Sequence, residues 1–294
     1  MKDWDDLRYL LAMSRCATMT EAAKSLRTNV ATVSRRMERL TERLGYPPFV
    51  RQQNGWQPAD RILPLIDIAE QVEGRLALEM SRVRSRSGEA RVPIQIGCLP
   101  FVSAGILLPD VARLPPQVNL TFIDRLTGEG LGDCDIVIRL GVPESGRLLT
   151  RRVGRVTFRL FSRSGGVPPQ DWAALSEEWD SHPAMQLGFA RFGQPPSLRV
   201  TTFGALAEIV KRTALAAPLP YCDAVDHPDI APLPAQDDDW TGEFWAFWHE
   251  TRRGDPVIEK MIDWIVDGFR RADTIYRRSG IGAVSQSGSQ AIPG

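Results

Sequence analysis

The 294-residue sequence predicts an α/β protein overall, with an all-α N-terminal part that ends in a small β-wing, then a long linker helix and a C-terminal α/β domain. Three observations predict this order. Capping residues and a tight corner divide residues 18–51 into two short helices and a strand. Apolar residues recur at heptad spacing from 62 to 83. From residue 92 onward, short apolar runs alternate with helical patterns, which is typical of an α/β sheet.

Two short helices are predicted between residues 20 and 44. Thr20 caps the first, with Glu21 in its first turn, where a carboxylate meets the positive end of the helix dipole. Asn29 caps the second helix, which begins at Val30, and Gly45 ends it. The apolar stripe of the second helix consists of Val33, Met37, Leu40 and Leu44. This stripe faces a core and leaves the opposite face of the helix free.

The opposite face is polar and basic, and it carries Ala31, Thr32, Arg35, Arg36 and Arg39. Asn54-Gly55, which follows the apolar start of a strand, is a two-residue hairpin signal for a wing. A solvated helix face is the alternative explanation of an Arg-rich helix. The agreement of caps, corner, stripe and hairpin instead favours a winged helix-turn-helix, whose second helix enters the major groove of DNA.

The same residues carry a family resemblance. The pattern is Thr20-x-Ala22-Ala23-x-x-Leu26, then Thr32-Val33-Ser34-Arg35-Arg36, then Leu40-x-x-Arg43-Leu44-Gly45-x-x-x-Phe49-x-Arg51. It resembles the winged helix-turn-helix of LysR-type transcriptional regulators. This sequence departs from the family's usual glutamine at Val30, its frequent proline at Ala31 and its common glutamate at Thr41. Val30 cannot hydrogen-bond a base edge, which leaves only apolar contact, for example with a thymine methyl group.

A DNA-binding domain is therefore predicted over residues 1–60. We expect the arginines of the second helix to contact phosphates or base edges, and the wing to touch the backbone or the minor groove. The predicted DNA-binding residues are Thr20, Asn29, Val30, Ala31, Thr32, Ser34, Arg35, Arg36, Arg39, Arg51 and Gln53.

A coiled-coil linker helix with a polar hinge is predicted over residues 61–88. Its dimerisation seam consists of Ile62, Leu65, Ala69, Val72, Leu76, Met80 and Val83. A dimer is favoured because two groove-reading helices must match two half-sites, and the resemblance implies the same linker. The alternative is a single amphipathic helix that lies on its own domain. The predicted assembly is a homodimer or a homotetramer.

The remainder of the chain predicts an α/β sheet, largely parallel. Strands are expected at 92–99, 118–123, 135–140, 156–161, 198–201, 218–221 and 244–249. Helices are expected at 106–114, 202–216 and 256–272.

This order of elements, with DIVIRLG at 135–141 and FWAFWH at 244–249, resembles the LysR-type effector domain. The resemblance implies a two-lobed, Rossmann-like α/β effector domain with a small-molecule cleft between the lobes. The predicted domain covers residues 89–275. Lobe I is expected at about 92–161 and 227–275, lobe II at about 162–226, and a disordered tail at 276–294.

An effector-binding site is predicted at the carboxyl ends of the strands, where open α/β sheets bind ligands. The helix N-terminus at Thr202 favours a small organic effector with an anionic group. The candidate residues are Pro100, Phe101, Val102, Ser103, Arg139, Thr201, Thr202 and Phe203. The alternatives are that Ser103 and Thr202 only cap helices, and that Arg139 forms a structural ion pair. Two stretches, 127–132 and 162–169, depart from the family and are expected to alter or open the cleft.

Composition narrows the functional classes. The formal net charge is +0, with a net of +4 up to Arg91, which argues against a protein that coats nucleic acid along its whole length. No signal peptide or apolar run long enough to cross a membrane is expected. The cysteines have no C-x-x-C spacing, so buried thiols are predicted, with thiol sensing at Cys98 or Cys134 as the alternative. No metal site, cofactor or catalytic motif is predicted.

The predicted function is sequence-specific transcription regulation by a non-enzymatic protein. Its expected partners are double-stranded promoter or operator DNA, a second copy of the chain and RNA polymerase, with no membrane partner. The expected location is the bacterial cytoplasm, at the nucleoid. The alternative is a ligand-binding or interaction module with degenerate DNA binding, and an enzyme built on the two-lobed domain is the third possibility.

Overall fold

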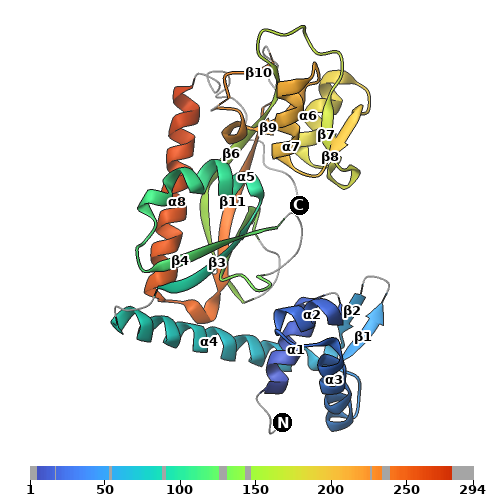
Figure 1. Cartoon of the computed structure of the whole chain (residues 1–294), viewed down its shortest axis with the longest axis vertical. Helices are drawn as coiled ribbons and strands as arrows, with labels where there is room; N and C mark the ends of the chain where they lie inside the picture. The colour runs from blue at the N-terminus through green and yellow to red at the C-terminus, as the bar shows by residue number, and fades with distance from the viewer. Residues whose placement is uncertain are drawn as a thin grey trace. The chain divides into compact units, whose positions relative to one another are not determined.

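The computed structural model describes residues 5–16, 18–52, 55–87, 91–125, 131–142, 147–225, 227–233 and 239–279. The chain forms two compact units (Figure 1). The first contains Met1–Ala90 and His249–Asp255, and the second contains Arg91–Trp248 and Pro256–Gly294.

The first unit begins with α1 (Asp5–Arg15), α2 (Met19–Ser25) and α3 (Val30–Leu44). The N-cap of α2 is Thr18, so the prediction of Thr20 was wrong. The Thr18 hydroxyl accepts the Glu21 amide at 3.1 Å, and the Glu21 carboxylate accepts the Thr18 amide at 3.1 Å. This reciprocal capping box satisfies two amides that would otherwise lack partners, and it moves the start of the helix ahead of Thr20.

The predicted caps and the apolar stripe of α3 are confirmed. Asn29 Oδ1 accepts the Thr32 amide at 2.8 Å, and Gly45 ends the helix with a left-handed φ of 75°. The core of this unit takes Val33, Met37 and Leu40 from α3, together with apolar side chains of α1 and α2. The helix is thus held by one face, as its spacing predicts.

The wing is an antiparallel hairpin of β1 (Phe49–Gln52) and β2 (Gly55–Pro58). Gln52 pairs with Gly55, so Gly55 is the first residue of β2 rather than the centre of the turn. Its φ of 113° explains the need for glycine there. Gln53 lies outside the described residues.

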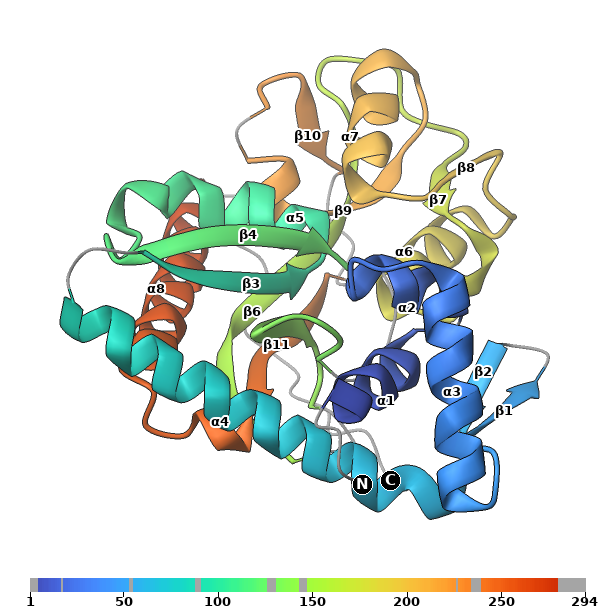
Figure 2. The same ribbon diagram turned by 60° about the horizontal axis from the view of Figure 1, so that its bottom comes forward.

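The linker consists of η1 (Asp60–Ile62) and the continuous helix α4 (Leu63–Ser87), which Figure 2 shows along its length. The predicted seam divides in two. Ile62 and Ala69 are buried in the core of the first unit, with Leu65 packed against it, and there the single-helix alternative is correct. Further along, Leu76, Met80 and Val83 are 50–61% exposed.

A short segment from later in the chain belongs to the same unit. The helical turn η6 (Glu250–Arg252) packs against α4 so closely that a Cβ atom at Gly74 would lie 1.8 Å from Thr251 Oγ1. Glycine at this position permits the close approach.

In the second unit, seven strands form one sheet within the described residues, in the order β10-β6-β11-β5-β3-β4, with β9 also paired to β6. Their bounds are β3 Val92–Cys98, β4 Val118–Asp124, β5 Ile136–Leu140, β6 Leu148–Arg163, β9 Ala217–Pro220, β10 Ile230–Pro232 and β11 Trp240–His249. A separate parallel pair is formed by β7 (Ala173–Leu175) and β8 (Leu198–Val200).

The prediction of a largely parallel sheet was wrong, because the sheet is mixed. Strand β3 pairs in parallel with β4 and β5, but β11 is antiparallel to β5, and β9 and β10 are antiparallel to β6. Parallel neighbours need long crossovers. The helical stretch between β3 and β4 supplies one, whereas β6 is a single 16-residue strand that pairs with segments returning from later in the chain.

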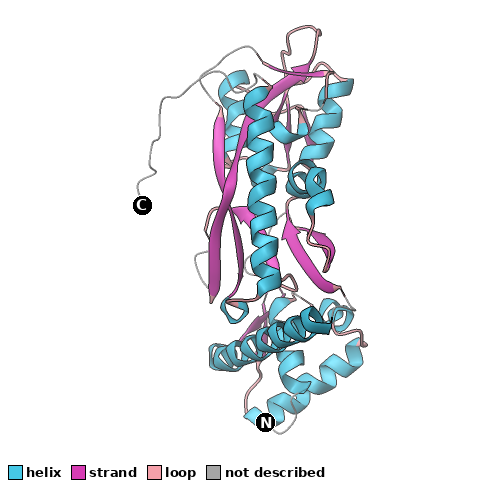
Figure 3. Ribbon diagram, turned by 90° about the vertical axis from the view of Figure 1, so that its left-hand side faces the viewer, coloured by secondary structure: helices cyan, strands magenta, loops and turns pink. Residues whose placement is uncertain are grey.

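The helical elements of this unit are α5 (Pro100–Val102), the π-helix η2 (Ser103–Leu107), the 3-10 helix η3 (Leu108–Arg113), η4 (Glu177–Trp179), α6 (Pro183–Phe192), α7 (Phe203–Arg212), η5 (Tyr221–Asp223) and α8 (Pro256–Arg278). The long α8 runs along the sheet (Figure 3). It extends six residues past the predicted end at 272, so residues 276–278, assigned to the tail, are helical. Residues 280–294 lie outside the described part of the chain.

Candidate functional site

The free face of α3 presents side chains that the rest of the first unit does not cover. Val30, Ala31, Arg35 and Arg39 are exposed, and positions 31, 35 and 39 follow one another at intervals of four residues. Such spacing places them on one side of the helix. This row, with Val30 at its N-terminal end, is the surface we call the α3 face.

Other predicted contacts on this helix are engaged locally. The Thr32 hydroxyl donates to Asn29 Oδ1 at 2.9 Å, and the Ser34 hydroxyl donates to the Glu38 carboxylate at 3.0 Å. Thr20 is exposed on α2, and Arg51 is exposed on β1.

Arg36 does not belong to the α3 face, and its predicted place on the free side of the helix was wrong. Its guanidinium donates to Asp6 at 3.0 Å and lies 5.3 Å from the centre of the Tyr9 ring. Arg43 also donates to Asp6, at 2.6 Å. The Asp6 side chain is only 3% exposed, so the two arginines neutralise a buried carboxylate and fasten α3 to α1.

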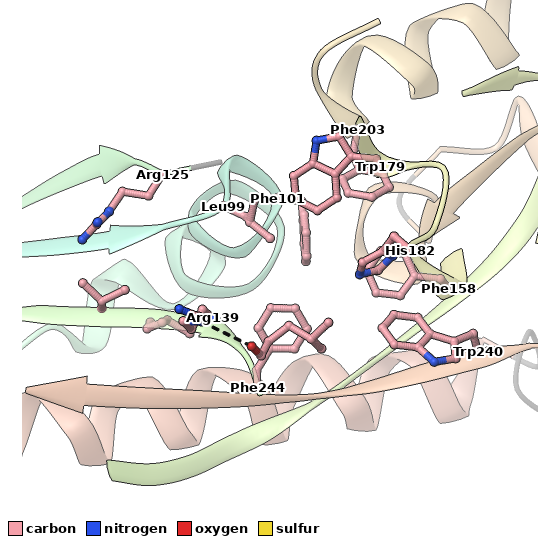
Figure 4. A pocket seen from close by; sticks show the side chains of 13 residues that line it. Leu99, Phe101, Arg125, Arg139, Phe158, Trp179, His182, Phe203, Trp240 and Phe244 are labelled. Atoms are coloured by element: carbon pink, nitrogen blue, oxygen red, sulfur yellow. Dashed lines mark hydrogen bonds between the residues drawn. The ribbon is translucent and has the colours of Figure 1, made fainter. Parts of the chain in front are cut away.

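The second unit contains a cavity of about 380 Å³ near the carboxyl ends of β3 and β5. Six of its thirteen lining residues are Phe or Trp side chains, which come from five separate elements (Figure 4). The lining residues are Leu99, Phe101, Arg125, Val137, Ile138, Arg139, Leu140, Phe158, Trp179, His182, Phe203, Trp240 and Phe244.

Of the predicted effector residues, Phe101, Arg139 and Phe203 line this cavity. Pro100, Thr201 and Thr202 instead line a void of only about 10 Å³ that shares Phe101 and Phe203 with it. Val102 and Ser103 are buried and are absent from both linings.

The capping alternative is correct for Thr202, and the Ser103 hydroxyl is engaged within its helical segment without capping the N-terminus of η2. Ser103 Oγ donates to the Pro100 carbonyl at 2.9 Å, and Thr202 Oγ1 accepts the Ala205 amide at 3.2 Å as the N-cap of α7. Both groups are therefore engaged within their own helical segments.

The polar groups of the cavity differ in how they are held. Arg125 donates to the Leu131 carbonyl at 2.8 Å. His182 Nδ1 accepts the Ala184 amide at 3.2 Å, which caps α6. Burial lowers the pKa of His182, so the ring stays neutral near pH 7 and carries its proton on Nε2.

Sequence reasoning missed most of this wall. It gives no role to Phe158, Trp179, His182 or Trp240. A usable signal was present at Phe244, since FWAFWH begins where a strand approaches the predicted ligand edge. The other aromatic residues come from segments whose proximity depends on the tertiary fold.

The cysteines do not favour thiol sensing. Burial raises the pKa of Cys98 to about 12, and burial also raises that of Cys134, although Arg125 opposes the shift. Both thiols are thus protonated at neutral pH and poorly nucleophilic. In the described part of the chain, no group of three or more His, Cys, Asp or Glu side chains is placed to hold a metal ion. No described helix is both long and apolar enough to cross a membrane.

Two family models match the chain. Residues 4–61 match the bacterial regulatory helix-turn-helix protein of the lysR family, and residues 87–270 match the LysR substrate binding domain. The chain belongs to the LysR family. It is a LysR-type transcriptional regulator with a helix-turn-helix DNA-binding domain and an effector-binding domain.

Individual relatives agree with this assignment. The chain is 27% identical over 283 residues to the Mau operon transcriptional activator of Paracoccus denitrificans, covering 91% of this chain and 96% of that protein. A full-length OxyR variant from Pseudomonas aeruginosa has a TM-score of 0.61 at 15% identity, covering 92% of this chain and 95% of that one. Full-length LysG from Corynebacterium glutamicum, with the bound effector arginine, has a TM-score of 0.55 at 14% identity, covering 92% and 98%.

Proposed function

We propose that this LysR-type regulator binds operator DNA as a homo-oligomer through the α3 face and responds to a small molecule held in the aromatic cavity. The observation that carries the DNA-binding part is the row of exposed residues at positions 31, 35 and 39, on a helix that is capped at both ends and buried on its other side. A helix held in this way can enter the major groove.

Arg35 and Arg39 supply the charged contacts of the α3 face, and Val30 supplies an apolar one. Val30 is 41% exposed at the first turn of α3, where recognition helices reach base edges. A valine side chain has no hydrogen-bonding group, so it selects for a thymine methyl. Arg51 on the wing contacts the phosphate backbone, and Arg36 is not part of this surface.

The self-association surface is the exposed apolar stripe on the second half of α4. Leu76, Met80 and Val83 are 50–61% exposed there, and a second copy of α4 would cover them. Water-exposed apolar side chains in such a row favour helix pairing. Leu76→Glu together with Met80→Glu should shift the protein toward monomer in sedimentation velocity, whereas the polar exchange Glu79→Gln on the same helix should not.

A small-molecule effector is supported by the cavity itself and by the substrate-binding family match. Full-length LysG, a protein of similar fold, is described with arginine as its bound effector. We propose that the cavity binds this effector without catalysing a reaction of it. The protein works in the bacterial cytoplasm at the nucleoid, and promoter-bound oligomers contact RNA polymerase.

The test of DNA binding is a gel shift with the promoter region beside the protein's own gene, repeated over a range of salt concentrations. Arg35→Ala should weaken specific binding about tenfold or more, because an arginine contact to a base edge is lost. Arg8→Ala is the matched control, since Arg8 is exposed on α1 and pairs only with Asp5 among the contacts described. No preference for the promoter fragment over random DNA at physiological salt would contradict the proposal.

The apolar contact of Val30 has its own test. Replacing each thymine of the bound site by deoxyuridine removes only the methyl group. One such replacement should weaken binding by the wild-type protein and have little effect on binding by Val30→Ala. Equal effects on both proteins at every position would remove Val30 from the base contacts.

A further inference from the structure

Arg139 has fewer partners than Arg125, the other arginine in the cavity lining. Among the described residues its one hydrogen bond runs from Nε to the Leu140 carbonyl, at 3.5 Å, and no carboxylate lies within ion-pair distance. The side chain is only partly exposed and lines the cavity. By contrast, the Arg199 guanidinium in the same unit binds Asp180 through two hydrogen bonds of 2.8 and 2.9 Å.

A partly buried guanidinium without a paired anion is energetically unfavourable. Removing it from water costs hydration energy that only a paired anion and well-formed hydrogen bonds recover. Guanidinium groups bind carboxylates with two parallel hydrogen bonds. A carboxylate that enters the cavity would therefore form an ion pair with Arg139, whereas a protonated amine would be repelled by the guanidinium.

The remaining wall suits an aromatic ring. Phe101 makes edge-to-face contacts with Phe158, Phe203 and Phe244, with ring centres 5.4–5.9 Å apart. The ring centre of Trp240 lies 5.3 Å from that of Phe158 and 4.9 Å from that of His182. Because these rings already support one another, the wall is formed before a ligand arrives, and a bound ring adds further edge-to-face contacts.

The charged and aromatic parts of the cavity lie on different sides. Figure 4 shows Arg139 on the left and His182 with Trp240 on the right, with Phe101 and Phe244 between them. A ligand that satisfies both sides carries an anionic group at one end and a flat apolar body at the other. The volume of about 380 Å³ is near the lower limit for ligand pockets, which suits one or two rings.

We propose that the cavity is specific for an aromatic monocarboxylate, with its carboxylate on Arg139 and its ring among Phe101, Phe244 and Trp240. His182 Nε2–H, which is free of the α6 cap, donates to a polar substituent on the far side of the ring. A single carboxylate is specified because the other lining arginine, Arg125, already donates to Leu131 and Cys134 lies against it. This inference rests on the proposed function, which makes the cavity the effector site.

The experiment titrates the full-length protein with benzoate, phenylacetate and indole-3-acetate by isothermal calorimetry. Benzylamine and benzamide serve as the cationic and neutral probes of similar shape. At least one carboxylate should bind, and its affinity should exceed that of both nitrogen compounds. Binding should also change the fluorescence of Trp179 and Trp240.

Arg139→Gln should weaken carboxylate binding about 10- to 100-fold, as expected for the loss of hydrogen bonds to a charged group. Arg155→Gln is the matched control, because Arg155 is exposed on β6 and outside the lining. Thermal unfolding followed by circular dichroism checks that both variants fold.

His182→Asn keeps a side chain able to cap α6 and removes the ring. This variant should weaken the binding of only those carboxylates that carry a second polar group.

Three outcomes overturn the inference: tighter binding of benzylamine than of the carboxylates, equal binding by wild type and Arg139→Gln, or no binding by any of the three carboxylates. None of these affects the promoter gel shift, which tests the proposed function separately. If carboxylates bind and Arg139→Gln removes the binding while no promoter fragment is preferred, the inference holds for the cavity and the regulator proposal fails.

Discussion

Two aspartates with buried carboxylate oxygens, Asp6 in the first unit and Asp223 in the second, have opposite surroundings. Asp6 in the first unit accepts hydrogen bonds from Arg36 and Arg43 and is 3% exposed at its side chain. Asp223 in the second unit lies in η5, and its Oδ2 is buried with no hydrogen-bond partner in the described part of the chain. Burial raises the pKa of Asp223 to about 6, with a smaller opposing effect from Lys211.

The difference shows that the partner, and not burial itself, decides what a buried carboxylate does. At Asp6 two guanidinium groups recover the cost of leaving water, so the charge joins α1 to α3. At Asp223 the cost is not recovered, so the neutral form is favoured and the site binds a proton as the pH falls. The following three changes test this contrast, from the largest expected effect to the smallest.

Asp6→Ala should lower the free energy of unfolding by about 3 kcal/mol, because it leaves two arginines facing a site without an anion. Urea denaturation of the full-length protein measures the loss. Asp5→Ala is the control, since Asp5 is 40% exposed and also contacts Arg36. It should cost under about 1 kcal/mol. Equal losses in the two variants would show that Asp6 is not the centre of the network.

Asp223→Asn should make the protein more stable above pH 6, by about 2 kcal/mol, because a buried charge is avoided. The folded-state pKa of about 6 lies above the ordinary value of 3.8. The favourable contribution of Asp223 is therefore complete below pH 4 and is lost as the pH rises through 6. Urea denaturation at several pH values should show a smaller decline for the variant over this range. Parallel curves for the two proteins would contradict the raised pKa.

Arg36→Met should cost about 1.5 kcal/mol, and Arg43→Met about 0.5 kcal/mol, because the first arginine is more deeply placed. Their side chains are 18% and 49% exposed, and Arg36 also lies over Tyr9. Denaturation of the two variants gives the order directly. The reverse order would mean that Arg43, with its shorter contact to Asp6, holds the carboxylate.

Local sequence predicted much of the first unit. Asn29 and Gly45 fixed both ends of α3, and the spacing of Val33, Met37 and Leu40 identified its buried face. These features depend on residues within a few positions of one another, so helix geometry alone relates them. The same reasoning failed at Arg36, because its orientation depends on Asp6, thirty residues away.

The apolar repeat of the linker helix likewise shows what local sequence leaves undecided. A repeat of apolar residues predicts which side of α4 avoids water, but it does not say what covers that side. Ile62 and Ala69 pack into their own unit, whereas Leu76 and Val83 remain exposed. Only the arrangement of α1 beside the start of α4 decides where the change occurs.

The sequence by itself determined the order of the two units, the ends of the recognition helix, the family and three residues of the cavity. The tertiary structure decided the cavity's chemistry, because its wall brings together side chains from residues 99 to 244 that no local period connects. It also decided which arginines are paired. Asp6 forms an ion pair with Arg36, whereas no described carboxylate reaches Arg139, since an ion pair forms only where folding places opposite charges within reach.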